Sequence, residues 1–168
     1  WTGSNTLKNS TGYNLTQLMV GSEGTLGVVT KIVLKLIPYP SQNVLMLVPF
    51  KSATKACEAV SWVFQNGITP SAMEFMERDA IDWTLKYVDG INIKVEAHHN
   101  AHLLIEVDGF EMEPLYTLAE RIVAIMQEYE CDEVLFADTA DQKDQLLKMR
   151  RRVGEAVKSN SIYKEEDT

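Results

Sequence analysis

The chain has 168 residues, of which 45% are hydrophobic, so it is long enough for one domain with its own core, or for one domain plus a piece of another. Its formal net charge of −8 would repel a polyanion, which argues against nucleic acid as a partner. No apolar run approaches the roughly 18 residues that span a bilayer, and no signal peptide is visible, so we expect no transmembrane segment and a cytoplasmic location.

The N-terminal part of the chain contains one expected strand. Residues 25–37, TLGVVTKIVLKLI, alternate loosely between apolar and polar side chains and are rich in β-branched residues, which is typical of a strand. Pro38 and Pro40 end this segment and predict a hinge. If the strand has no partner in its own chain, its edge is exposed, and a homodimer through exposed strand edges is then expected.

The remainder of the chain alternates between expected strands and helices. Strands are expected at residues 43–50, 70–76, 102–110 and 132–138, and helices at 52–67, 78–90, 113–129 and 140–158. Ser52 is the expected N-cap of the first of these helices, and Gly67 lies just past its end. The order predicts an α+β fold of the ferredoxin-like type, with an antiparallel sheet and helices on one face.

Cysteine and histidine give no sign of a metal site in the sequence. Cys57 and Cys131 belong to no CxxC pair, which argues against a zinc site and a disulfide scaffold, so both are expected to be reduced core residues. His98, His99 and His102 have a spacing that can place ligands on one face, but no acidic or cysteine ligand accompanies them. We therefore expect them in a solvated loop, with no bound metal.

The segment GSEGTLG contains glycines at 21, 24 and 27, for which two interpretations stay open. It forms either a glycine-rich hairpin turn, or a turn whose free N–H groups bind an anion or a carbonyl-rich ring. A phosphate-binding nucleotide loop is disfavoured, because a strand rather than a helix is expected next and the lysine of such loops is missing.

The longer segment STGYNLTQLMVGSEGTLGVVTKIVLKLIPYP, residues 10–40, resembles the end of the FAD-binding domain of FAD-linked oxidases of the vanillyl-alcohol-oxidase type. The most similar branch holds the glycolate oxidase FAD subunit, D-lactate dehydrogenase and D-2-hydroxyglutarate dehydrogenase. The resemblance implies that residues 1–40 are the C-terminal piece of a flavin domain and 41–168 an incomplete substrate, or cap, domain of a longer protein. It also implies that the following residues contact FAD: Ser22, Glu23, Gly24, Thr25, Leu26, Gly27, Val28 and Val29.

Arg150 is the candidate for binding substrate. At roughly 100° per residue, a helix would place it in one apolar stripe with Leu146, Val153 and Val157. A guanidinium there requires an anion nearby, unless it reaches solvent at the edge of the stripe. That anion is either an internal carboxylate or a ligand. The resemblance implies a ligand, since an arginine of this helix binds the substrate carboxylate in the family, and Lys164 resembles a lysine that contacts substrate in the 2-hydroxyglutarate branch.

The resemblance implies an FAD-dependent enzyme as the parent of this chain. The parent would oxidise a small 2-hydroxy acid, of the glycolate or D-lactate type, by hydride transfer to flavin, and the 168-residue chain alone would be inactive. The sequence identifies neither the catalytic base nor the electron acceptor. The alternative is a catalytically silent ferredoxin-like module with a ligand-binding or regulatory role.

Overall fold

The computed structural model describes residues 1–6 and 8–160. The chain divides into two compact units, and the boundary falls between Pro38 and Tyr39. This boundary lies at the proline pair where the sequence predicts a hinge.

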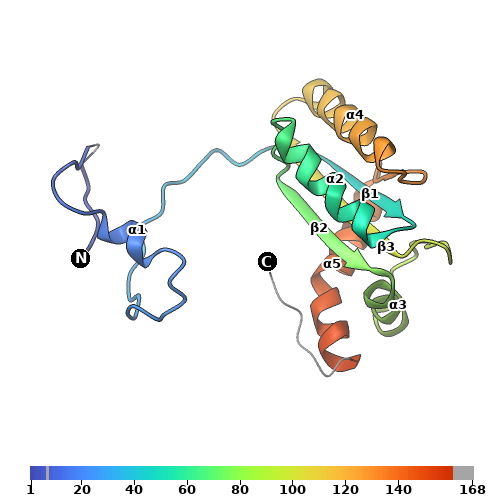
Figure 1. Ribbon diagram of the computed structural model, residues 1–168, viewed down its shortest axis with the longest axis horizontal. Coiled ribbons are helices and arrows are strands. Elements are labelled where there is room, and N and C mark those ends of the chain that lie inside the picture. The colour runs from blue at the N-terminus through green and yellow to red at the C-terminus, as the bar shows by residue number, and fades with distance from the viewer. Residues whose placement is uncertain (7, 161–168) are drawn as a thin grey trace. The chain divides into compact units, whose positions relative to one another are not determined.

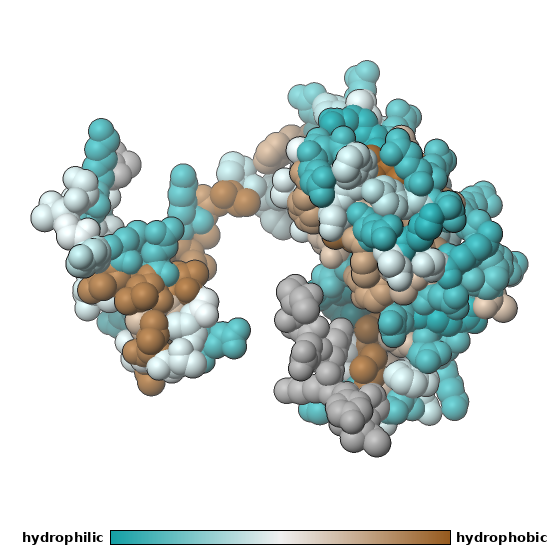
Figure 2. All heavy atoms as spheres, viewed as in Figure 1, coloured by the Kyte–Doolittle hydropathy of each residue, from teal (hydrophilic) through white to brown (hydrophobic). Residues whose placement is uncertain are grey.

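The first unit contains one short helix, α1 (Leu15–Met19), which begins where the side chain of Asn14 accepts a hydrogen bond from the Gln17 amide. The strand expected at residues 25–37 is absent, although every residue of that range is described. A strand needs a neighbour to complete its backbone hydrogen bonds, and no described residue pairs with this segment. Its apolar side chains are largely exposed, and hydrophobic residues accordingly show on the surface of this unit in Figure 2.

The second unit is built on a four-stranded antiparallel sheet. Its strands are β1 (Gln42–Phe50), β2 (Ala72–Glu77), β3 (Ala101–Gly109) and β4 (Leu135–Phe136), in the spatial order β2-β3-β1-β4. Figure 1 labels the first three. This arrangement confirms the predicted α+β class and the antiparallel sheet. The last strand is shorter than predicted, because only Leu135 and Phe136 continue the ladder with β1.

Helices cover both faces of the sheet, so the expectation of helices on one face was wrong. One layer consists of α2 (Ala53–Gln65) and α4 (Met112–Glu128), and the other of α3 (Arg78–Tyr87) and α5 (Ala140–Asn160). Strand β1 contributes alternate residues to the two layers: Met46 packs with α2 and α4, whereas Leu45 packs with α3 and α5. A strand that is apolar on both faces has to be covered on both.

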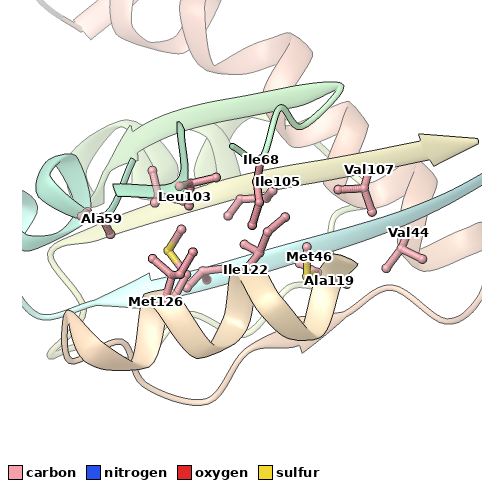
Figure 3. Close-up of a cluster of buried hydrophobic side chains, with 14 of the residues drawn as sticks. Val44, Met46, Ala59, Ile68, Leu103, Ile105, Val107, Ala119, Ile122 and Met126 are labelled. Carbon is pink, nitrogen blue, oxygen red and sulfur yellow. The ribbon is translucent and has the colours of Figure 1, made fainter. Parts of the chain in front are cut away.

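The core between the sheet and the first layer, which Figure 3 shows, is the larger of the two. Ile105 of β3 and Met46 of β1 meet Ile122 and Met126 of α4 there, and all four are fully buried. The second core joins Leu104 of β3 to α3 and α5. Both cores contain side chains of the two central strands, β1 and β3. These strands are therefore packed on both faces, which makes them the most tightly packed part of the unit.

Helix α2 begins and ends as the sequence predicts. The Lys55 amide donates to the Ser52 hydroxyl at 3.4 Å, and Gly67 follows the helix with a φ of 70°. The left-handed conformation at Gly67 suits glycine, because a Cβ disfavours it in other residues. The N-cap is thus confirmed.

Cys57 was expected in the core but lies outside the buried face of α2, as does Trp62. Cys57 is exposed, and the Trp62 side chain is 40% exposed, while Cys131 is partly buried. The buried residues of this helix are the smaller Ala56, Ala59 and Val63. Adjacent helical positions differ by roughly 100°, so placing Cys57 on the core face would have turned Ala56 away from it.

None of the described helices is long and apolar enough to cross a membrane.

Candidate functional site

The glycine-rich segment of the first unit forms a turn with several residues in left-handed conformations. Gly21, Glu23 and Gly24 have positive φ angles of 78°, 47° and 80°. A Cβ built on Gly21 or Gly24 would meet no atom within 4 Å, so the space beside both backbones is open. The turn therefore offers main-chain groups that a planar ligand can approach closely.

Hydrogen bonds close this turn. The Ser22 amide donates to the Met19 carbonyl at 3.2 Å, and the Thr25 amide donates to the Ser22 carbonyl at 2.9 Å. The Thr25 hydroxyl donates to the same carbonyl at 2.6 Å. Thr25 thus fixes the turn from within.

Apolar side chains follow the turn and are exposed. Leu26, Val28 and Val29 each expose more than half of their surface, and Val28 and Val29 border a hollow that Met19 also lines. Open backbone beside exposed apolar side chains fits the flavin ring of FAD, which presents both a π-face and polar edges. Residues 22–29, which the resemblance assigns to FAD, form this turn and the exposed apolar segment after it.

Arg150 lies on α5 but outside the buried stripe of that helix, so its expected placement was wrong. The buried residues are Leu146, Met149, Val153 and Ala156. Met149 and Ala156 move the centre of the stripe away from Arg150, and the arginine side chain is 48% exposed. Val157, expected in the stripe, is only partly buried.

The guanidinium of Arg150 is held by an internal carboxylate. Its Nη2 donates to Oε1 of Glu74 on β2 at 2.6 Å. The pair borders a hollow of about 230 Å³ that Phe75 and Gly154 also line. The sequence left three possibilities for Arg150: exposure to solvent, an internal carboxylate, or a bound ligand. The described contacts match the internal carboxylate, and the hollow leaves room for a small anion beside the pair. Lys164 lies outside the described residues.

The histidines do not form a solvated loop. His99 and His102 are buried, at 7% and 2% exposed, and only His98 is exposed. Nε2 of His98 and Nε2 of His99 lie 3.1 and 2.9 Å from Oδ2 of Asp132, a residue far away in the sequence. No local pattern joins Asp132 to the histidines, so sequence reasoning missed it.

Burial and charge shift the pKa values in this cluster. Burial, followed by the charges of His99 and Arg78, lowers the pKa of His102 to about 4, so His102 is neutral near pH 7. Burial would raise the pKa of Asp132, but hydrogen bonds from His99, Lys51 and His98 outweigh it and lower that pKa. The Asp132 carboxylate is therefore ionised and able to act as a ligand.

Comparison with known proteins places this chain in a family. Residues 39–168 match the family model described as FAD linked oxidases, C-terminal domain. The chain belongs to this family. The family that residues 10–40 indicate is thereby confirmed, and the cofactor of the family is FAD, as its description states.

Several curated proteins resemble this FAD-linked oxidase chain along most of its length. The D-lactate dehydrogenase of Anaerostipes hadrus is 31% identical over 98% of the chain, and that of Archaeoglobus fulgidus 35% identical over 95%. The glycolate oxidase subunit GlcD of Bacillus subtilis is 34% identical over 89%. The chain spans only 35%, 34% and 31% of these three relatives, respectively, which is about a third of their length.

A solved structure supports the fold of this FAD-linked oxidase chain. An alkyldihydroxyacetonephosphate synthase superposes with a TM-score of 0.52 and 18% identity, over 89% of this chain and 32% of the other. The predicted flavin-contacting residues 22–29 and Arg150 belong to different compact units of the chain.

Proposed function

We propose that the whole protein is an FAD-dependent oxidoreductase that oxidises a small 2-hydroxy acid to the 2-oxo acid. The observation that carries this proposal is the similarity of nearly the entire chain to D-lactate dehydrogenases and a glycolate oxidase subunit. The open glycine turn in the first unit and the arginine beside a hollow in the second unit support it.

The chain contributes binding groups for the flavin and for the substrate of the proposed reaction. The turn from Ser22 to Val29 would hold the flavin through backbone groups and through its exposed valines. When bound, FAD supplies the acceptor for the hydride that leaves the α-carbon of the substrate. The hydroxyl proton would pass to a base that the described residues do not identify.

Arg150 is the proposed anchor for the substrate carboxylate. A guanidinium binds a carboxylate through two parallel hydrogen bonds, which fixes the orientation of the acid as well as its position. Glu74 now makes one of the hydrogen bonds that such a ligand would make. A substrate would therefore replace Glu74 or share the guanidinium with it.

The test is made on the whole protein. Flavin absorbance is followed on anaerobic addition of D-lactate, glycolate and D-2-hydroxyglutarate, with the wild type, Arg150→Ala and Arg152→Ala. Arg152 is the matched control, because it lies on the same helix, is exposed and pairs with Glu155 at 2.6 Å, away from the hollow. We expect one acid to bleach the flavin, and this bleaching to be lost in Arg150→Ala and kept in Arg152→Ala.

Two other outcomes would contradict the proposal, one for the cofactor and one for Arg150. A whole protein without flavin would refute the oxidoreductase. Equal loss of bleaching in both arginine variants would refute the specific role of Arg150.

A second candidate concerns the 168-residue chain by itself. Without the rest of the flavin domain, we expect it to be a folded, catalytically silent ferredoxin-like module that binds no FAD. The basis is that the second unit has two buried cores of its own, whereas the apolar side chains of residues 25–37 are exposed. Flavin absorption that stays with the purified chain would refute this candidate. The homodimer through residues 25–37 stays a prediction, which light scattering on the same sample would test.

A further inference from the structure

The side chains of His98, His99 and Asp132 form a cluster at one end of the sheet. It shares no residue with the proposed flavin turn or the proposed carboxylate anchor. We propose that His98, His99 and Asp132 form a binding site for a divalent transition-metal ion, of which Zn²⁺ is the best match. The site would take the ion through two imidazole nitrogens and one carboxylate oxygen.

The geometry of the three side chains suits one shared ion. One ligand atom from each residue lies within 4.8 Å of the other two, and Oδ2 of Asp132 is 3.1 and 2.9 Å from the two Nε2 atoms. Two ligands that each lie about 2.1 Å from a tetrahedral zinc ion are about 3.4 Å apart. Small side-chain rotations would therefore bring all three atoms to coordination distance.

The backbone positions both halves of the cluster against the same end of β1. On the histidine side, the Asn100 amide donates to the Phe50 carbonyl at 2.9 Å, and the Asn100 side chain donates to the Lys51 carbonyl at 2.7 Å. On the other side, the Asp132 amide donates to the Pro49 carbonyl at 3.0 Å. The cluster is therefore arranged before any ion arrives, which lowers the entropic cost of binding.

The donor set and its surroundings favour zinc over magnesium or calcium. Imidazole nitrogen suits zinc and related transition metals, whereas magnesium and calcium prefer oxygen ligands alone. Because His98 is exposed, an ion can enter from solvent, and water can supply the fourth ligand. Lys51 Nζ lies 3.3 Å from Oδ1 of Asp132, the other oxygen, so it orients the carboxylate and leaves Oδ2 to the ion.

The competing account is a cluster held by hydrogen bonds alone, with Asp132 accepting from both imidazoles. The two accounts differ in what happens when metal is added. A tag-free 168-residue chain, stripped with a chelator, is titrated with ZnCl₂ by calorimetry and with CoCl₂ by visible absorption. We expect saturation at one ion per chain and intense cobalt bands of a four-coordinate site.

Substitutions at the ligands should weaken binding. We expect zinc affinity to fall at least tenfold in His98→Asn and in Asp132→Asn. Because His98 is exposed, its variant should stay folded, and circular dichroism would check this. In wild type, zinc should also shift the ¹⁵N resonance of the His98 imidazole, which reports coordination independently of affinity.

Two matched controls separate this site from its neighbours. Glu130→Gln removes a nearby carboxylate that pairs with Lys55 at 2.6 Å, and zinc affinity should not change. Cys131→Ser removes the adjacent thiol and should also leave affinity unchanged. The proposal is overturned by the absence of stoichiometric zinc binding, by unchanged affinity in Asp132→Asn, or by loss of binding in Cys131→Ser.

Discussion

Arg150 of α5 donates a hydrogen bond to Glu74 of β2, with 2.6 Å between Nη2 and Oε1. The contact joins a helix on one face of the sheet to an edge strand. The two side chains are 48% and 36% exposed, so water screens the attraction between them.

Because the pair is screened, it should add little to stability. We expect a double-mutant cycle of Arg150→Ala and Glu74→Ala to give a coupling of about 0.2–1 kcal/mol in the free energy of unfolding. Urea denaturation of the 168-residue chain would measure it. A coupling of several kcal/mol would show that the pair is structural and would argue against a carboxylate ligand displacing Glu74.

Neutralising Glu74 should increase the affinity of the whole protein for an anionic substrate. In Glu74→Gln, the guanidinium loses its competing carboxylate, and a repulsive charge beside the hollow is removed. We expect KM for the 2-hydroxy acid to fall several-fold while kcat changes less. Glu77→Gln, an exposed position on the same strand, is the control and should leave KM unchanged. A raised KM in Glu74→Gln would mean that Glu74 orients Arg150 for the substrate.

Truncating a buried side chain in the core beside α4 should strongly lower the free energy of unfolding. Ile122 is fully buried there, so Ile122→Ala should lower the free energy of unfolding by about 2–5 kcal/mol, through lost burial and the cavity left behind. Trp62→Ala deletes a larger side chain that is 40% exposed, and we expect about 1 kcal/mol or less. Denaturation followed by circular dichroism compares them. A larger effect at Trp62 would contradict the observed orientation of α2.

The end of α2 should require a residue that tolerates positive φ. Gly67→Ala introduces a Cβ at a φ of 70° and should destabilise the chain by about 1–2 kcal/mol. Gly67→Asn should lose less, because asparagine adopts this conformation more readily. Thermal unfolding of the two variants would rank them, and the reverse order would contradict the described turn.

Acid should destabilise the fold through His102. Its pKa is lowered from 6.5 to about 4 in the folded chain, with His99, Arg78 and Asp82 as the charged or titratable groups around it. Between pH 6.5 and pH 4, the His102 imidazole is protonated in the unfolded chain but stays neutral in the folded chain. The free energy of unfolding therefore falls as the pH drops from 6.5 towards 4. The loss should approach about 3 kcal/mol.

The measurement of this effect compares two proteins across pH. Urea denaturation is followed from pH 7 to pH 4 in the presence of a chelator, for the wild type and for His102→Leu. The variant cannot titrate at this position, so its stability should fall less steeply over the same range. Parallel curves would show that His102 does not stay neutral in the fold.

Local signals in the sequence predicted the elements of the second unit well. Ser52 and Gly67 mark the two ends of α2 because capping depends on residues within a few positions of the helix end. The number of helix layers could also have been predicted. The run NVLMLVPF, residues 43–50, lacks alternation, which indicates a strand covered on both faces.

The α+β class, most element positions and, through residues 10–40, the family could all be predicted from the amino-acid sequence. Which distant side chains meet could not be predicted, because it depends on how the elements pack. The pairing of β2 with β3 and the packing of α5 bring Glu74 to Arg150, and the fold around the end of β1 brings Asp132 to His98 and His99. Residues 25–37 show the same limit, because β-propensity is local whereas a sheet requires a partner strand.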